Sequence, residues 1–245
     1  MSSKCVVNVS FGKKYVKGQY RLSNMLNVFE RDTLTRFYTN GYPANCPVHQ
    51  EVPFAFKAYA LKEASARSDR LLWLDSCMVP IAPLDRIWEY AEEHGAWFGR
   101  NGFKNADWTD IVTLPALFPE ILLAQDMKEH AQKWGGDRIL DCLNPLEAAK
   151  SLNETIEHVV AGAFALDLRH KTGRLFLEEY FRLARETRAF CGSIHGPKGV
   201  AHRHDQTAAS VICWRLGVPL TTSPDLFAYK GRKDESTVIV ADGNI

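Results

Sequence analysis

The chain has 245 residues, of which 46% are hydrophobic and 24% are charged. This composition is close to the average of globular proteins, so it excludes a disordered or fibrous chain, and the length suits one large domain. The 30 lysine and arginine residues nearly cancel the 29 aspartate and glutamate residues, which leaves a net charge of +1. The sequence therefore offers no overall attraction to nucleic acid or to an anionic membrane, although the net charge leaves open a local basic patch that binds nucleic acid.

The six cysteines are scattered, with no Cys-x-x-Cys pair and no tight cluster with histidine. That distribution argues against a zinc ribbon or a disulfide scaffold and favours free thiols in a reducing compartment. The first residues contain no apolar signal region, and the longest apolar stretch, Val159–Leu166, is shorter than the roughly 20 residues that span a bilayer. We therefore expect a cytoplasmic protein without a membrane span.

The first hundred residues predict strands that alternate with helices. A β-branched run at Cys5–Val9 predicts a buried first strand, and apolar residues at helical spacing from Tyr20 onward predict a helix. A second helix is expected over Phe54–Ser68, followed directly by an apolar strand at Leu71–Leu74. A third helix is expected from Pro83 to a stop at Gly95, and prolines interrupt the stretch between the first two helices.

The second half of the chain continues this alternation. Residues 96–109 are rich in glycine, asparagine and aromatic residues, so they predict a loop. A strand is expected at Val159–Leu168. Helices are expected at Thr109–Trp134 in two pieces, Pro145–Leu152, Leu175–Phe190 and Thr207–Leu216. The last segment, Pro219–Ile245, has few strong signals, and we expect its end to be mobile.

This order of elements predicts an α/β fold: one domain over residues 1–245 with a mostly parallel sheet flanked by helices. In such sheets ligands bind beyond the carboxyl ends of the strands. Three segments follow predicted strands: Phe11-Gly12, Asp75-Ser76 and the turn after Leu168. We therefore expect these three segments to face one crevice.

Asp75 is the sharpest candidate for chemistry. It comes directly after the apolar strand, so its carboxylate is held at the rim of the sheet. Through a divalent cation, such a carboxylate can help to hold a diphosphate. The alternative is that Asp75 only caps the following turn, where aspartate is favoured.

The segment Leu71–Ser76, with Lys57 upstream and Pro80 downstream, resembles the donor-binding half of glycosyltransferases of the GT-A fold, in the nucleotide-diphospho-sugar transferase superfamily. In those enzymes a short acidic motif, usually Asp-x-Asp, ends a central strand and binds a divalent metal and the diphosphate. The present triplet is Asp75-Ser76-Cys77, so the second acid is missing. The resemblance implies a nucleoside-diphosphate sugar as donor and Mn²⁺ or Mg²⁺ held by Asp75, with metal dependence left open.

Two later segments support the resemblance. The run Ala161, Gly162 and Ala163 is similar to the strand whose small residues let the backbone approach the donor sugar, although an ordinary buried strand is the alternative. The run His202–Gln206 resembles the acidic motif beside the acceptor, in which Asp205 is a general base or acts with Gln206 on the donor sugar. The alternative for Asp205 is a plain helix cap. The histidines His202 and His204 are candidate metal ligands or phosphate contacts, or surface residues without a role.

The resemblance also assigns the remaining site residues. Donor binding is expected from Phe11, Gly12, Tyr15, Arg21, Lys57, Asp75, Ser76, Ala161, Gly162, Ala163 and Gln206. Acceptor binding is expected from Trp97, Arg100, Trp108 and His204, because aromatic faces pack on sugars while polar groups bind hydroxyls. The basic loop His195–Gly199 can close over phosphates. Residues 1–100 are then the donor half, residues 101–217 the acceptor and catalytic half, and residues 218–245 a C-terminal segment.

The resemblance implies a hexosyl- or pentosyltransferase in which Asp75 and Asp205 are catalytic and the acceptor is a hydroxyl of a glycan, a protein, a small molecule or a modified nucleobase. Asp205 as a base favours inversion of the anomeric centre, whereas the Asp205-Gln206 pair is similar to retaining members. Two other functions stay open. One is a nucleotidyltransferase that makes the activated sugar, and the other is a binding module without catalysis, which Cys77 in place of an acid favours.

Overall fold

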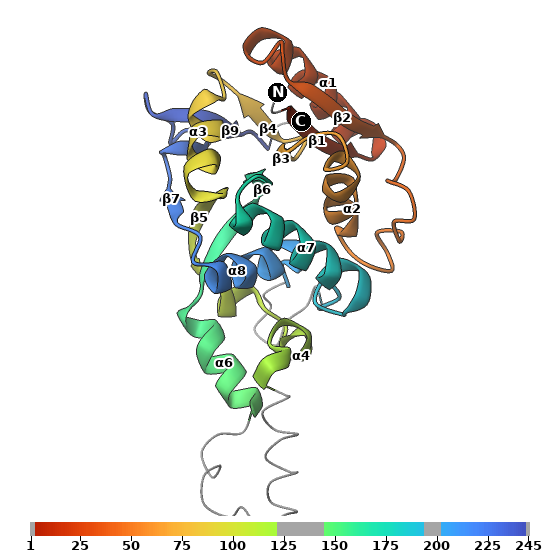
Figure 1. The fold of residues 1–245 in the computed structure, drawn as a ribbon, viewed down its shortest axis with the longest axis vertical. Helices are drawn as coiled ribbons and strands as arrows, with labels where there is room; N and C mark the ends of the chain where they lie inside the picture. Colours follow the sequence, from red (N-terminus) through yellow and green to blue (C-terminus); the bar gives the residue numbers. More distant parts are fainter. Residues whose placement is uncertain (1–2, 122–144, 194–201, 244–245) are drawn as a thin grey trace, which may run out of the picture.

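The computed structural model describes residues 3–121, 145–193 and 202–243 (Figure 1). Its strands are β1 (Lys4–Ser10), β2 (Leu34–Thr39), β3 (Arg70–Leu74), β4 (Met78–Pro80), β5 (Ala96–Lys104), β6 (Glu157–Asp167), β7 (Leu220–Thr222), β8 (Leu226–Tyr229) and β9 (Thr237–Ala241). Its α-helices are α1 (Gly12–Phe29), α2 (Ala55–Ala64), α3 (Asp85–His94), α4 (Leu114–Leu117), α6 (Pro145–Thr155), α7 (Lys171–Glu186) and α8 (His204–Leu216). Two short 3₁₀ helices are η1 (Asn105–Trp108) and η2 (Ile111–Thr113).

A six-stranded sheet with the order β2-β1-β3-β6-β5-β7 forms the centre of the molecule. Neighbouring strands pair in parallel except at β6, which is antiparallel to both β3 and β5. A second, three-stranded sheet has the order β4-β9-β8. The expected α/β fold with a mostly parallel central sheet flanked by helices is thus confirmed.

Alternating side chains of the central strands face two separate cores. On one face Val7, Trp73 and Phe164 pack with α2, α7 and α8, which lie together in Figure 1. On the other face Val6 and Leu72 pack with α1, α3 and the small sheet. Because both faces are covered, the central strands read as continuous apolar runs rather than as alternating ones.

The helices follow the predicted order, with shifted ends. α1 begins at Gly12, before the apolar spacing becomes visible, because its first turns carry lysines and tyrosines. α3 ends as expected at Gly95, whose φ of 84° places it in the left-handed region. Part of the helix expected over Thr109–Trp134, and the basic loop His195–Gly199, lie outside the described residues. None of the described helices is both long enough and apolar enough to cross a bilayer.

One expected element is wrong, and two regions form strands that the sequence pattern does not reveal. The expected loop over residues 96–109 is mostly the strand β5, because Ala96, Trp97 and Phe98 are fully buried in the two cores despite their glycine-rich surroundings. The C-terminal segment, which has few strong signals in the sequence, forms β7, β8 and β9. The side chains of the edge strand β2 are mostly exposed, so its sequence lacks the apolar pattern from which a strand could be predicted.

The antiparallel direction of β6 corrects the expected crevice. Leu74 pairs with Ala163 and Arg70 pairs with Asp167, so the end of β6 lies at the edge where β3 begins. The turn after Leu168 therefore lies at the edge of the sheet opposite to Asp75. The early part of β6, at Ala161 and Gly162, reaches the edge where Asp75 stands.

Candidate active site

Three charged side chains from three elements meet where β3 ends. Nζ of Lys57, on α2, lies 3.1 Å from Oδ1 of Asp75 and 3.0 Å from Oδ2 of Asp205, on α8. The same ammonium donates a 2.9 Å hydrogen bond to the carbonyl of Ala161 on β6. The side chains of Lys57 and Asp205 are 4% and 6% exposed, whereas that of Asp75 is 33% exposed. Asp75 is thus the member of this cluster, called the Lys57 cluster below, that faces solvent.

One ammonium serves two carboxylates in the Lys57 cluster. Burial alone lowers the pKa of Lys57, but the charges of Asp205 and Asp75 outweigh burial and raise that pKa, so the lysine stays charged. Burial raises the pKa of Asp75, Lys57 lowers it and Asp205 raises it again, with a net increase. The ionised form of Asp75 is therefore held at a cost in the folded protein, as is common at functional sites.

A buried polar network fixes the end of β3. The side-chain amide of Asn8 donates to the carbonyl of Leu74 at 2.6 Å, and Gln19 of α1 donates to Asn8 at 2.7 Å. Ser76, expected to bind the donor, is buried and its hydroxyl lies 3.4 Å from Asn8, so it belongs to this network. Next to it, Nε1 of Trp73 donates to Oδ1 of Asp75 at 2.8 Å. These bonds hold the Asp75 carboxylate in one orientation.

The small residues of β6 make room for Asp75. The backbone N–H of Asp75 donates to the carbonyl of Gly162 at 2.7 Å. A Cβ at position 162 would lie 2.3 Å from Cε of Met78 and 3.1 Å from Oδ2 of Asp75. A side chain at position 162 would displace the end of Met78 and crowd the Asp75 carboxylate, so the expected approach of the backbone at Ala161–Ala163 is an approach to the carboxylate itself.

The residues expected to bind the donor near the N-terminus lie after β1, at the same edge of the sheet. Gly12 opens α1 with a φ of 76°, and its N–H donates to Oδ1 of Asn40 at 2.9 Å. Tyr15 is exposed on the first turns of α1. Phe11 instead packs on Tyr42, with ring centroids 4.4 Å apart, so it contributes to the core.

Arg21 lies deeper along α1 and forms an ion pair of 3.5 Å with Asp242. Lys230 pairs with the same carboxylate at 3.2 Å. The N–H of Asp242 donates to the carbonyl of Cys77 at 2.9 Å, which places this group of charges beside the Asp75-Ser76-Cys77 turn. Two cations thus share one carboxylate next to the Lys57 cluster.

A group of aromatic and polar side chains surrounds the start of α8. The Arg203 guanidinium lies 4.4 Å from the ring centroid of Trp108, and Trp108 stacks on His158 at 6.2 Å. The side-chain amide of Gln206 lies 3.3 Å from Nδ1 of His158. His158 is fully buried, and burial, with the charges of Arg203 and His202, lowers its pKa to about 3, so it is neutral. Trp108, His158, Arg203 and Gln206 form what we call the Trp108 cluster.

Sequence reasoning did not identify His158 or Arg203 as site residues. A single histidine at the start of an apolar strand gives no signal of its own. Arg203 stood within the His202–Gln206 run, but its partner Trp108 lies far away in the sequence, so the pair becomes visible only in the fold.

The structure separates the remaining residues that were expected to bind the acceptor. Trp97 is fully buried and its Nε1 donates to Oγ1 of Thr221 at 3.0 Å, so it is a core residue. Arg100 is exposed on β5, opposite Val159 of β6. His204 is buried, with Nδ1 2.8 Å from the carbonyl of Phe190. Of these three, Arg100 alone reaches the surface.

His202, one of the expected metal ligands, is not free to hold a divalent ion. Nδ1 of His202 accepts the N–H of Asp110 at 3.1 Å and Nε2 lies 3.1 Å from the carbonyl of Ala189, so both ring nitrogens are engaged. Burial lowers the pKa of His202 to about 4 and raises that of Cys77 to about 11, which keeps the Cys77 thiol protonated. Over the described parts of the chain, no three or more histidine, cysteine or acidic residues are grouped to hold a metal ion.

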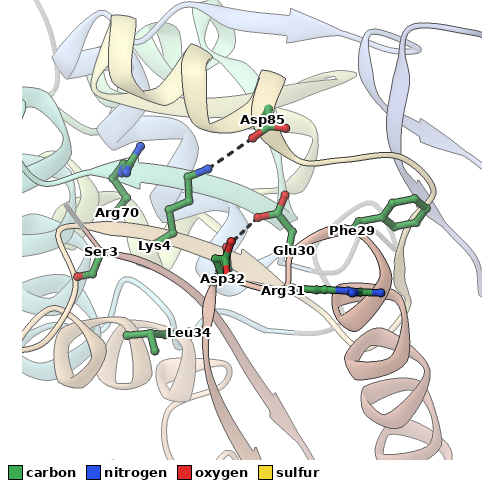
Figure 2. Close-up of a pocket in the computed structure, with 10 residues that line it drawn as sticks. Ser3, Lys4, Phe29, Glu30, Arg31, Asp32, Leu34, Arg70 and Asp85 are labelled. Carbon is green, nitrogen blue, oxygen red and sulfur yellow. Dashed lines mark hydrogen bonds and ion pairs between the residues drawn. The ribbon is translucent and has the colours of Figure 1, made fainter. Parts of the chain in front are cut away.

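A separate cavity of about 560 Å³ lies at the opposite edge of the sheet, where β1, β2 and β3 begin (Figure 2). Figure 2 shows Lys4 reaching across it to Asp85, at 3.5 Å. Glu30, also on its wall, accepts hydrogen bonds from the N–H of Leu84 at 2.9 Å and from Trp88 at 3.3 Å. These carboxylates are engaged in packing α3 onto the sheet, so we assign no chemistry to this cavity.

Comparison with solved structures identifies the fold. A glycosyltransferase involved in the glycosylation of the major capsid of PBCV-1 matches 99% of this chain and 94% of its own, with a TM-score of 0.50 and 10% identity. The chain has a GT-A-type fold. The mouse xyloside xylosyltransferase 1 (TM-score 0.46, 11% identity, 99% of this chain and 98% of that one) and the galactosyltransferase LgtC (0.45, 10%, 98% and 87%) are also similar. Neither models of protein families nor curated proteins match the sequence.

Proposed function

We propose that this chain is a glycosyltransferase that moves a sugar from a nucleoside-diphosphate sugar to a hydroxyl. The observation that carries the proposal is the Lys57 cluster. In it Asp75, from the first half of the sequence, and Asp205, from the second half, share one ammonium at the carboxyl end of the central sheet. Carboxylates at this edge of a GT-A-type fold are well positioned to act on a ligand bound there.

In the proposed reaction the acceptor oxygen forms a bond to the anomeric carbon of the donor sugar. The bond from that carbon to the diphosphate breaks, and its electron pair leaves with the nucleoside diphosphate. Asp75, which faces solvent, orients the donor, and Asp205 takes the acceptor proton. Lys57 and Tyr180 both contact Oδ2 of Asp205, at 3.0 and 3.4 Å, which supports Oδ1 as the oxygen that receives the proton. This arrangement favours inversion, and retention through the Asp205-Gln206 pair is the other stereochemical outcome.

For the donor, we propose that residues 1–100 bind the nucleotide and diphosphate. Gly12 and Tyr15 are available at the start of α1, where a Cβ on Gly12 would meet no atom within 4 Å and Tyr15 is exposed. Arg21 stands beside the turn that contains Cys77. An exposed aromatic ring and a cation are the groups that suit a base and a phosphate.

For the acceptor, we propose the Trp108 cluster together with Arg100. Phe103 is exposed and packs edge-on against Trp108, with ring centroids 5.5 Å apart. Gln206 and Arg203 add an amide and a guanidinium beside these rings. Aromatic faces combined with hydrogen-bonding groups support a carbohydrate hydroxyl as the first acceptor to test, ahead of a protein, a small molecule or a nucleobase.

A screen of nucleoside-diphosphate sugars tests the function. The protein is incubated with each donor and a panel of sugar acceptors, and the released nucleotide is measured. We expect free nucleoside diphosphate with at least one donor. Release of pyrophosphate from a nucleoside triphosphate and a sugar phosphate would instead indicate a nucleotidyltransferase, and donor binding without turnover would indicate a binding module.

Substitution of Gly162 by alanine tests the closeness of β6 to Asp75. We expect about a 10-fold loss of donor affinity, or about 1.4 kcal/mol, because the new Cβ displaces the end of Met78 and shifts the Asp75 carboxylate slightly. Calorimetry with the donor from the screen measures the effect. The matched control is Gly99→Ala on β5, where a Cβ would lie no closer than 3.8 Å to another side chain. Equal affinities of the two variants would contradict the expectation.

A further inference from the structure

We infer that the ammonium of Lys57 takes the place of a divalent cation in this site, so that the donor binds without added metal. The inference rests on the proposed function for the part that concerns the donor. Its structural part, that the oxygens around Lys57 do not accept a metal ion, stands without that function and can be measured on the protein alone.

The first argument is the coordination of the ammonium. A lysine ammonium has three N–H donors, and Nζ of Lys57 has three oxygens around it at 2.9 to 3.1 Å, from Ala161, Asp75 and Asp205. The side chain of Lys57 is almost fully buried. A divalent ion bound to the same oxygens at about 2.0–2.6 Å would lie within a few ångströms of the ammonium, and the two cations would repel each other.

The second argument is the remaining ligand set at Asp75. Oδ1 of Asp75 accepts from Trp73 at 2.8 Å and pairs with Lys57 at 3.1 Å, and Oδ2 lies 3.4 Å from the same ammonium. The position of the second acid in the resembling enzymes holds Cys77, whose thiol is a poor ligand for Mn²⁺ or Mg²⁺. Because Lys57 contacts both oxygens of Asp75, a hard cation that binds this carboxylate would have to displace the ammonium.

The third argument is the supply of positive charge for a diphosphate. The Lys57 cluster carries one negative charge in excess when both carboxylates are ionised. Beside it, Arg21 and Lys230 pair with Asp242, whose N–H donates to the carbonyl of Cys77. Side-chain cations of this group can meet the leaving diphosphate where a metal would otherwise do so.

The first experiment measures Mn²⁺ binding to the free protein by electron paramagnetic resonance. We expect the natural protein to leave Mn²⁺ unbound at about 0.1 mM, and the double variant Lys57→Met with Cys77→Asp to bind at least ~10-fold more tightly, because it removes the internal cation and restores the second acid. Binding of one Mn²⁺ by the natural protein that Asp75→Asn abolishes would overturn the inference. The natural protein decides this point even if the double variant does not fold.

The second experiment compares donor affinity in EDTA with that in 1 mM Mn²⁺, by calorimetry on the natural protein with the nucleotide sugar from the screen. We expect the two dissociation constants to agree within about 3-fold. An affinity that rises at least ~10-fold with Mn²⁺ would overturn the inference while supporting the proposed function. If no nucleotide sugar binds in either buffer, the proposed function fails, and the measurement of Mn²⁺ on the free protein still decides the role of Lys57.

Discussion

Substitution of Lys57 by methionine should lower the free energy of unfolding by about 3–5 kcal/mol. Methionine fills a similar volume but leaves Asp75 and Asp205 facing each other without their shared cation, and Asp205 is almost fully buried. Uncompensated buried charge is among the largest single effects on stability. Urea unfolding followed by circular dichroism measures the loss.

The matched control for this variant is Lys62→Met, on the exposed face of the same helix, which should change stability by no more than about 0.5 kcal/mol.

The pH dependence of stability adds a second readout for Lys57→Met. Without Lys57, the charge that most lowers the pKa of Asp75 is gone and the hydrogen bond from Trp73 alone lowers it, while burial and Asp205 still raise it. A carboxyl group with a raised folded pKa binds its proton more tightly when folded, so stability is present at low pH and is lost as pH rises through that pKa. The Lys57→Met variant should therefore regain part of its stability as the pH is lowered from 7. If this variant instead equals Lys62→Met in stability at every pH, Lys57 does not balance a buried charge.

Substitution of Asp75 by asparagine should reduce turnover at least ~100-fold with little or no loss of stability. Asparagine keeps the shape and the acceptor for Trp73 but removes the charge that the proposed reaction uses. Because the pKa of Asp75 is raised, its ionised form is disfavoured in the folded protein, and a neutral side chain relieves that cost. Steady-state kinetics and thermal melting, measured on the same preparation, check both expectations.

The control for Asp75→Asn is Asp167→Asn at the opposite end of the sheet. Asp167 is buried and pairs with Arg169, but it is far from the Lys57 cluster along β6. Its substitution should lower the melting temperature and leave turnover per folded molecule unchanged. Full activity in Asp75→Asn, or a similar loss of turnover in both variants, would contradict the assigned role of Asp75.

Much of the fold could be predicted from local sequence patterns. The apolar run Leu71–Leu74 and the alternation of helices with strands led to an α/β fold, because strands buried on both faces read as continuous apolar stretches. The pattern carries no information on strand direction, however. β6 reads the same whether it runs parallel or antiparallel to β3, and this is why the turn after Leu168 was assigned to the wrong edge.

The candidate site could be predicted only in part. The position of Asp75 after a buried strand and of Asp205 at a helix start was visible in the sequence, and Lys57 was a weak candidate. The ammonium of Lys57 joins the carboxylates of Asp75 and Asp205 only through tertiary packing, because the sheet brings α2, the end of β3 and α8 together. The prediction that Trp97 binds the acceptor was wrong for a similar reason. The sequence does not show whether an aromatic residue in a glycine-rich stretch is exposed or, as Trp97 is, buried in a core.

The antiparallel strand β6 also determines when the site can form during synthesis. β6 pairs with β3 on one side and β5 on the other, yet it emerges from the ribosome well after both of them. Until Glu157–Asp167 has been made, β3 has an unpaired edge, Lys57 lacks the carbonyl of Ala161, and Asp205 does not yet exist. The nascent amino-terminal half therefore carries an incomplete charge pair and an open strand edge, which are the conditions in which chaperones are most needed.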